Sequence, residues 1–265
     1  MLSSISLSEK RVIIRVDYNV PIEDGDILDN YRIKKSLPTI NYCLAQGASI
    51  ILMSHLGRPK NIDSAYSLLP VCNELEKLLN KTVIFSNDCI SDEAIIKSSS
   101  LEPGQIHLLE NLRFHSGELD NCSQFSQKLS FHGDVYINDA FGTAHRSHAS
   151  NVGLAELFEE KCYGLLIEKE LHYLNDTMKN PVNPLTVVMG GAKIKGKIEL
   201  IENFLNIADN LLIGGALSFP FLKAKGLDIH SPLINDESLD NANRLLNYAN
   251  SIGKKIILPS DFVTA

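Results

Sequence analysis

The feature that most constrains the fold is a set of short apolar runs without polar alternation. These runs are rich in Val, Ile and Leu, as are strands that are buried on both faces of a parallel sheet. The candidate strands are Val12–Val16, Ser49–Met53, Thr82–Phe85, Ile106–Leu109, Val135–Asn138, Thr186–Met189, Leu211–Ile213 and Lys255–Leu258. Strands of this kind need helices on both faces of their sheet.

Segments with helical periodicity separate these runs. The segment Ile33–Gln46 has its apolar residues on one stripe and is followed by Gly47, a residue typical of helix ends. The same pattern predicts helices over Leu68–Asn80, Lys195–Ala208 and Glu237–Ser251. Alternating strands and helices predict doubly wound α/β sheets with right-handed crossovers.

A proline-containing segment suggests where the chain divides. Lys161–Lys179 reads as one long helix, and Asn180–Pro184 after it cannot continue a helix. We therefore predict a first domain over 1–172, a helix end and linker over 173–184, and a second domain over 185–265. The second domain has few candidate strands for an independent sheet, so we expect it to be truncated.

Composition excludes several classes of function. The net charge of −7 argues against a broad surface for nucleic acid or anionic membrane. The five cysteines are odd in number and form no C-x-x-C pair, which favours reduced thiols in the cytoplasm. We find no signal peptide and no apolar run that would span a bilayer.

Four arginines lie just past predicted strand ends or at a helix start: Arg32, Arg58, Arg113 and Arg146. Ligands of open α/β sheets bind outside the carboxyl ends of the strands, and a guanidinium fits carboxylate or phosphate oxygens. Arg32 alone would read as a solvated surface residue. The set of four, with Asp17, Asn19 and His55 nearby, favours an anion site.

The neighbouring polar residues leave alternatives open. His145 and His148 have the spacing of a metal pair, but Arg146 between them would repel a cation. We rank an anion-site role first, hydrogen-bonded loop histidines second and a metal last, and expect no metal site. Asp17 is equally consistent with binding a substrate hydroxyl, holding an arginine or shaping a turn.

A second cluster, M-G-G-A-K-I-K-G-K-I, spans 189–198 between a predicted strand and a predicted helix. It is not a Walker motif, yet Gly190 and Gly191 allow close backbone approach. Lys193, Lys195 and Lys197 place positive charge at the unfavourable end of a helix dipole, which a polyphosphate would neutralise. A second glycine turn, I-G-G-A-L over 213–217, is a weak signal alone.

In combination, these stretches closely resemble the phosphoglycerate kinase family. The matching stretches are R-V-D-Y-N-V-P (15–21), S-H-L-G-R-P-K (54–60), L-L-E-N-L-R-F (108–114), D-V-Y-I-N-D-A-F-G-T-A-H-R-S-H-A-S (134–150), E-K-E-L (168–171), G-G-A-K-I (190–194) and L-P-S-D (258–261). They run through nearly the whole chain in the order that the family has.

The resemblance implies two Rossmann-like domains joined by a helical hinge. It also implies reversible phosphoryl transfer between ATP and the carboxylate of 3-phosphoglycerate in glycolysis. The acid would bind the first domain, and ATP or ADP with Mg²⁺ would bind the second. We accordingly expect a cytoplasmic monomer with small-molecule substrates, and neither nucleic acid nor membrane as a partner.

The resemblance also implies site residues. The 3-phosphoglycerate site would comprise Asp17, Tyr18, Asn19, Arg32, His55, Leu56, Gly57, Arg58, Arg113 and Arg146. The nucleotide site would comprise Gly191, Lys193, Lys197 and Gly215. Arg32, Lys193 and Lys197 would act on the transferring group. His55 and Arg58 would help to hold the acid, which explains an imidazole and a guanidinium after a buried strand.

Three departures from the family pattern bear on function. Tyr18 replaces the usual phenylalanine, and Ala216 and Pro220 replace a glycine and a threonine in the second glycine turn. The sequence ends just after L-P-S-D, before the family's later loop that binds terminal phosphates and magnesium. We therefore expect this chain alone to bind 3-phosphoglycerate without turnover.

Two alternatives accompany the kinase interpretation. One is a truncated, non-catalytic module that binds 3-phosphoglycerate. The other is a nucleotide-linked oxidoreductase, which is disfavoured because no G-x-G-x-x-G is followed by an acidic residue about 20 positions later.

Overall fold

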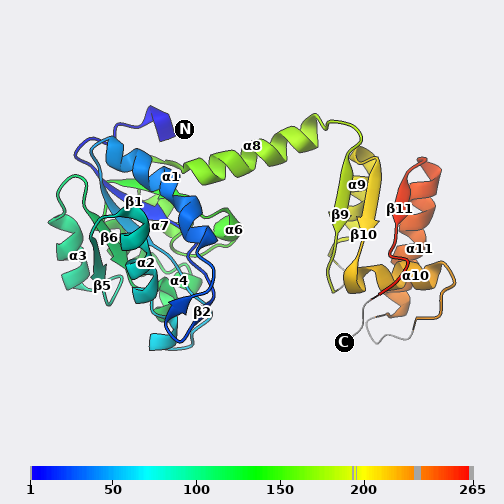
Figure 1. The fold of residues 1–265 in the computed structure, drawn as a ribbon, viewed down its shortest axis with the longest axis horizontal. Coiled ribbons are helices and arrows are strands. Elements are labelled where there is room, and N and C mark those ends of the chain that lie inside the picture. Colours follow the sequence, from blue (N-terminus) through cyan, green and yellow to red (C-terminus); the bar gives the residue numbers. More distant parts are fainter. Residues whose placement is uncertain (1, 193, 195, 230–233, 263–265) are drawn as a thin grey trace. The chain divides into compact units, whose positions relative to one another are not determined.

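The computed structural model describes residues 2–192, 194, 196–229 and 234–262 (Figure 1). The chain divides into two compact units, Met1–His172 and Tyr173–Ala265. No helix within the described residues has the length and apolar character needed to cross a membrane. Each unit is an α/β structure with its own parallel sheet.

The first unit is built on a six-stranded sheet in the order β5-β6-β4-β1-β7-β8, in which all neighbours are parallel. Its strands are β1 (Arg11–Arg15), β4 (Ser49–Met53), β5 (Val83–Ser86), β6 (Ile106–Leu109), β7 (Val135–Asn138) and β8 (Lys161–Tyr163). A small antiparallel hairpin, β2 (Ile22–Glu23) and β3 (Asp26–Ile27), follows β1. This hairpin was not predicted from the sequence, because its strands are too short for a periodic signal.

Helices cover both faces of this sheet. The helices from here to the end of the unit are α1 (Tyr31–Ala45), α2 (Leu69–Leu79), α3 (Asp92–Ser99), α4 (Ser116–Leu119), α5 (Ser123–Ser130), α6 (Phe141–Ala144), α7 (Gly153–Glu156) and α8 (Leu165–Lys179), which continues into the second unit. One apolar core joins Ile14 and Leu52 to residues of α1 and α2, and the other joins Ile13 and Ile51 to residues of α3, α5 and α7. Successive strand residues thus enter opposite cores, which confirms the predicted doubly wound arrangement.

The predicted helix over Lys161–Lys179 is wrong in its first residues. Lys161–Tyr163 forms the edge strand β8, and α8 begins only at Leu165. Gly164 separates them, and a Cβ there would lie 2.3 Å from a carboxylate oxygen of Asp139. That carboxylate accepts the backbone N–H groups of Leu166 and Ile167, so a distant residue fixes where the helix begins.

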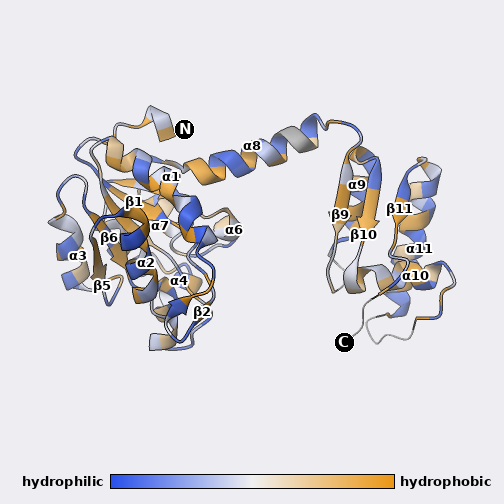
Figure 2. Cartoon of the chain, viewed as in Figure 1, coloured by the Kyte–Doolittle hydropathy of each residue, from blue (hydrophilic) through white to orange (hydrophobic). Residues whose placement is uncertain are grey.

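The second unit has a three-stranded parallel sheet in the order β11-β10-β9. Its elements are β9 (Thr186–Met189), α9 (Ile198–Ile207), β10 (Asn210–Ile213), α10 (Phe219–Ala224), α11 (Asp236–Ser251) and β11 (Lys255–Ile257). In Figure 2, β9 and β10 are hydrophobic along most of their length, and they pack with α9 and α11 in one core. The helix predicted from Lys195 begins at Ile198, so the prediction was three residues too early.

Candidate functional site

The polar residues of the first unit gather at one edge of its sheet. Arg15, the last residue of β1, is in register with Met53 of β4 on one side and Asn138 of β7 on the other. The loops that follow these parallel strands therefore leave the sheet together. They carry Asp17, His55 and Arg146, and the loop after β6 adds Arg113. This is the edge at which ligands bind in open α/β sheets.

An outer cluster consists of Asp17, Asn19, Arg32, Gly57 and Arg58. Arg32 lies in the first turn of α1, where its Nη1 is 2.6 Å from the Asp17 carboxylate. Asn19 accepts the Gly57 N–H at 2.8 Å. Asp17 therefore holds an arginine, which was one of the three roles left open. The Arg32 side chain is half exposed, so this pair contributes little stability of its own.

Gly57 is required by the backbone between His55 and Arg58. Its φ is +61°, and a Cβ there would lie 2.3 Å from the ring of Tyr66. Its carbonyl accepts a hydrogen bond from Arg113, and Arg58 follows it with an exposed side chain. The glycine thus lets the loop turn tightly while it connects the outer cluster to Arg113.

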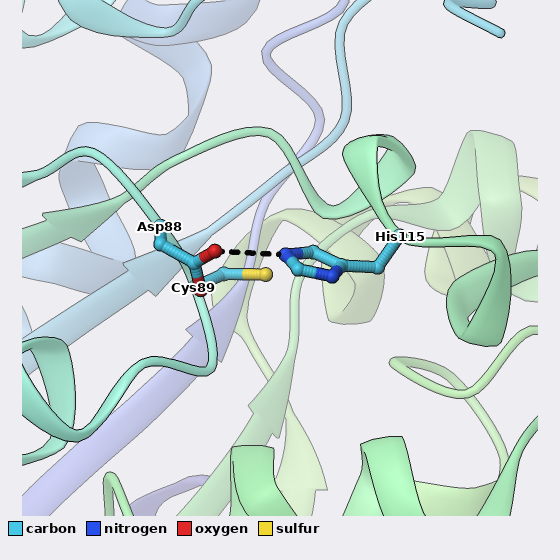
Figure 3. A group of neighbouring side chains, drawn as sticks. All are labelled: Asp88, Cys89 and His115. Atoms are coloured by element: carbon cyan, nitrogen blue, oxygen red, sulfur yellow. Dashed lines mark ion pairs between the residues drawn. The ribbon is translucent and has the colours of Figure 1, made fainter. Parts of the chain in front are cut away.

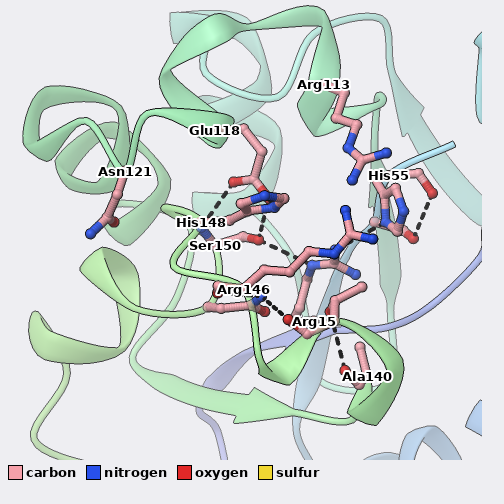
Figure 4. A network of polar contacts seen from close by, with 12 residues as sticks. Arg15, His55, Arg113, Glu118, Asn121, Ala140, Arg146, His148 and Ser150 are labelled. Carbon is pink, nitrogen blue, oxygen red and sulfur yellow. Dashed lines mark hydrogen bonds and ion pairs between the residues drawn. The ribbon is translucent and has the colours of Figure 1, made fainter. Parts of the chain in front are cut away.

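An inner cluster lies beside it and consists of Arg15, His55, Arg113, Glu118, Arg146 and His148 (Figure 4). Burial, followed by the charges of Arg15 and Arg113, lowers the pKa of His55 to about 2, so the imidazole is neutral. Burial and then the charge of Arg146 lower the pKa of Arg113. Within the described residues, the Nε of Arg113 is the buried side-chain atom without a hydrogen-bond partner.

Glu118 is the carboxylate that partly compensates this charge. It is fully buried, and it accepts hydrogen bonds from the Ser150 hydroxyl at 2.6 Å and the Ser150 N–H at 2.9 Å. His148 lies 3.6 Å from it. One carboxylate among three guanidiniums leaves an excess of positive charge in a partly buried site. An anion would balance that excess and give the Arg113 Nε a partner.

Two residues assigned by resemblance have side chains that turn away from this edge. The ring of Tyr18 is fully buried, and its hydroxyl bonds the Ser36 hydroxyl at 2.8 Å. Leu56 belongs to the same apolar core. Only their backbones could contribute to the site. A motif match assigns positions, whereas the direction of a side chain follows from strand and loop geometry.

Three residues that organise the site were not predicted from the sequence. Arg15 was not among the predicted site residues, yet it is fully buried and contacts His55. Asn111 donates to the carbonyls of Leu56 and Tyr66 and accepts from the Arg113 N–H, so it joins two site loops. Glu118 sits in a short helix that shows no periodicity. A charged residue directly after V-I-I was the signal available for Arg15.

The two glycine turns of the second unit lie together. The Leu217 N–H donates to the Gly191 carbonyl at 2.7 Å, and a Cβ on Gly215 would lie 3.6 Å from that same oxygen. The end of the Lys197 side chain lies beside Gly191. Lys197 immediately precedes α9, so it lies on the loop before the helix rather than in its first turn. Lys193 and Lys195 lie outside the described residues.

A group of three potential metal ligands, Asp88, Cys89 and His115, belongs to neither cluster (Figure 3). One Asp88 oxygen accepts the N–H groups of Ile90 and Ser91, and the other lies 3.2 Å from His115 Nε2. Burial raises the pKa of the Cys89 thiol well above its usual range. Both Asp88 oxygens therefore have partners within the chain, which favours a polar contact between Asp88 and His115 over a metal site.

The fold and the candidate site define a class: parallel α/β proteins with a cluster of basic residues at one sheet edge and glycine turns after the strands of a second sheet. The chain belongs to the phosphoglycerate kinase family, whose model matches residues 2–265. This finding confirms the family that the motifs indicated.

Individual relatives agree with the family model. The chain is 45% identical to the phosphoglycerate kinase of Chloroherpeton thalassium over 265 residues, which cover 100% of this chain and 67% of that protein. Among solved structures, the phosphoglycerate kinase of Coxiella burnetii is 38% identical with a TM-score of 0.82, covering 97% of this chain and 65% of that one. The enzyme of Pyrococcus horikoshii is 33% identical with a TM-score of 0.83 and 67% of its chain covered. The chain thus spans about two thirds of the length of these relatives.

Proposed function

We propose that the protein transfers a phosphoryl group reversibly between ATP and the carboxylate of 3-phosphoglycerate, as the kinase activity in its relatives' names suggests. The observation that carries the proposal is the inner cluster, in which buried guanidiniums exceed the carboxylate that balances them. Arg113 has a buried Nε without a partner among the described residues. A small acid with a carboxylate and a phosphate matches such a cluster in charge and in hydrogen-bonding capacity.

The proposed acid site comprises Asp17, Asn19, His55, Arg58, Arg113 and Arg146, with backbone contributions from Tyr18, Leu56 and Gly57. Arg113 and Arg146 supply charge to the anionic groups, and neutral His55 supplies one N–H donor. Arg32 lies on the outer side, held by Asp17 at 2.6 Å. We assign Arg32 to the transferring group, because its exposed side chain can exchange its carboxylate partner for a phosphoryl oxygen.

The proposed chemistry needs no general base. The accepting group is already a carboxylate, so no proton has to leave before it attacks the terminal phosphorus. The protein contributes positioning and neutralises charge on the phosphoryl oxygens. This requirement agrees with a site that is rich in arginine.

The nucleotide part of the proposal rests on Gly191, Lys193, Lys197 and Gly215. The glycine turns let backbone approach phosphate closely, and the Lys197 side chain lies against Gly191. ATP or ADP would bring Mg²⁺, which neutralises charge on the phosphate oxygens. Transfer requires the two sites to approach one another, so the proposal includes a hinge motion during turnover.

The remaining assignments belong to the same proposal. The acid site would lie in a domain over 1–172, residues 173–184 would be the hinge helix end and linker, and 185–265 would bind the nucleotide. All five cysteines are free, which supports a cytoplasmic location. We also propose a monomer with small-molecule substrates, as the resemblance to the family implies.

Titration calorimetry with 3-phosphoglycerate tests the acid site. Arg146→Ala should weaken binding by about 2–5 kcal/mol, because it removes one partner of a desolvated charge pair. Arg146→Lys should restore only part of that loss, since an ammonium cannot form two parallel hydrogen bonds. Arg244→Ala, which removes an exposed arginine of α11, is the matched control. Equal affinity in wild type and Arg146→Ala would overturn the assignment.

A further inference from the structure

Arg15 occupies an unusual position for an arginine, because its whole side chain is buried at the end of β1. Its Nη2 lies 3.1 Å from His55 Nδ1, and its Nε donates to the Ser150 hydroxyl at 3.1 Å (Figure 4). Its Nη1 donates to the carbonyl of Val16. Burial lowers its pKa, yet a guanidinium does not lose its proton in a protein.

The contact with His55 has only one possible direction. A guanidinium carries N–H donors and no acceptor, so Nδ1 of His55 must accept. A neutral imidazole that accepts at Nδ1 carries its proton on Nε2. Two other forms of His55 would set an N–H against an N–H of Arg15, namely the Nδ1–H tautomer and the imidazolium. Arg15 therefore selects one of three forms.

Arg15 is itself fixed by a buried carboxylate two contacts away. The Ser150 hydroxyl, which accepts from Arg15, donates its own proton to Glu118 at 2.6 Å. The Ser150 N–H donates to the other Glu118 oxygen at 2.9 Å. Ser150 and Glu118 are both fully buried. This chain of contacts leaves the guanidinium little freedom to turn away from His55.

We propose that Arg15 is a positioning residue that holds His55 as the neutral Nε2–H tautomer, so that the imidazole offers a donor to an anionic substrate. This inference rests on the proposed function. The opposite tautomer would turn a nitrogen lone pair toward substrate oxygens and repel them. An imidazolium would add a charge that the neighbouring guanidiniums disfavour. The arrangement provides one N–H donor whose protonation does not change near neutral pH.

Nuclear magnetic resonance of the chain with ¹⁵N-labelled histidine tests the tautomer without any ligand. In wild type, His55 should show a protonated Nε2, an unprotonated Nδ1 and no titration between about pH 5 and 8. The His55→Gln spectrum identifies the signals by their loss. A protonated Nδ1, or a titration within that range, would overturn the proposal.

Variants of Arg15 then test its part. In Arg15→Met, His55 should populate both tautomers or titrate, and 3-phosphoglycerate should bind about tenfold more weakly or worse, with an affinity that depends on pH. Arg15→Lys should restore the Nε2–H form in part, because an ammonium can still donate to Nδ1. Arg11→Met, at the other end of β1, is the control and should leave the His55 signals unchanged.

Each of these measurements either supports or overturns the proposed role of Arg15. If Arg15→Met does not fold, Ser150→Ala replaces it, because it removes the support of the guanidinium and keeps the charge. Unchanged His55 signals in the folded variant would overturn the positioning role. A wild type that shows the Nε2–H tautomer but binds no 3-phosphoglycerate would contradict the proposed function and leave the role of Arg15 standing.

Discussion

A buried chain of hydrogen bonds in the first unit predicts how stability depends on pH. His132 is fully buried, and its Nε2 lies 3.0 Å from the Cys89 carbonyl, which can only accept. Its Nδ1 must then accept from the Ser98 hydroxyl at 2.6 Å. The Ser98 oxygen then accepts a hydrogen bond from Nδ1 of His107. Nε2 of the same imidazole accepts one from the Ser86 hydroxyl. Every proton in this series of hydrogen bonds is assigned, and a proton added to an imidazole would have no acceptor.

The sign of the effect follows from the pKa of His132. Burial lowers it from 6.5 to about 4. In the unfolded chain the imidazole takes up a proton below about pH 6.5, whereas in the folded chain it does so only near pH 4. The stability that the neutral imidazole provides is therefore present above pH 6.5 and is lost as the pH falls toward 4. Between about pH 7.5 and 5 this loss amounts to roughly 2 kcal/mol.

Urea unfolding of wild type and His132→Gln at both pH values measures that loss. Because the chain has no tryptophan, circular dichroism is the suitable probe, and hydrogen exchange of the β6 amides reports the first unit separately. Between about pH 7.5 and 5, the decrease in the free energy of unfolding should be roughly 2 kcal/mol smaller in His132→Gln than in wild type. Ser86→Ala is the control, since it removes a hydrogen bond and keeps both imidazoles. Equal pH dependence in His132→Gln and wild type would refute the reasoning.

Three further predictions concern the site and its surroundings. Gly57→Ala should cost about 1–2 kcal/mol of unfolding free energy because its φ is +61°, and unchanged urea stability would show that the loop relaxes. Glu118→Gln should cost on the order of 3 kcal/mol because it leaves Arg15 without a balancing charge, and a thermal unfolding midpoint equal to wild type would contradict this. Elemental analysis of the purified chain should find no stoichiometric zinc, and one zinc per chain that disappears in His115→Ala would show that the group with Asp88 and Cys89 is a metal site.

The strands β1, β4, β6 and β7 of the first unit could be predicted from the sequence because they are buried on both faces. Runs such as Ser49–Met53 leave little alternative to a buried strand, and β4 has those bounds. The strand β8 could not be recognised, because Lys161–Tyr163 alternates between exposed and half-buried residues at a sheet edge. Its boundary with α8 depends on Asp139, which is close only in the folded chain. Periodicity in a sequence therefore does not reveal short elements or helix ends that are fixed by distant residues.

The residue types of the candidate site could be predicted from the sequence, whereas most of their contacts could not. Arginines after strand ends indicated an anion site, because parallel strands bring their carboxyl ends to one edge. The partners that fix those groups could not be seen: Arg15 orients His55, and Glu118 balances the charge through Ser150. The motif match also could not show that the Tyr18 ring enters the core. Such details depend on side-chain direction, which sequence position alone does not determine.

The central claim is that the excess positive charge of the inner cluster exists to bind 3-phosphoglycerate. A crystal structure of the chain with 3-phosphoglycerate tests this most directly. We expect density for the acid beside Arg113 and Arg146, with an acid oxygen in hydrogen-bond contact with the Arg113 Nε and another with His55 Nε2. Well-defined density for the acid elsewhere on the chain, with both arginines unchanged and without contact to it, would contradict the account.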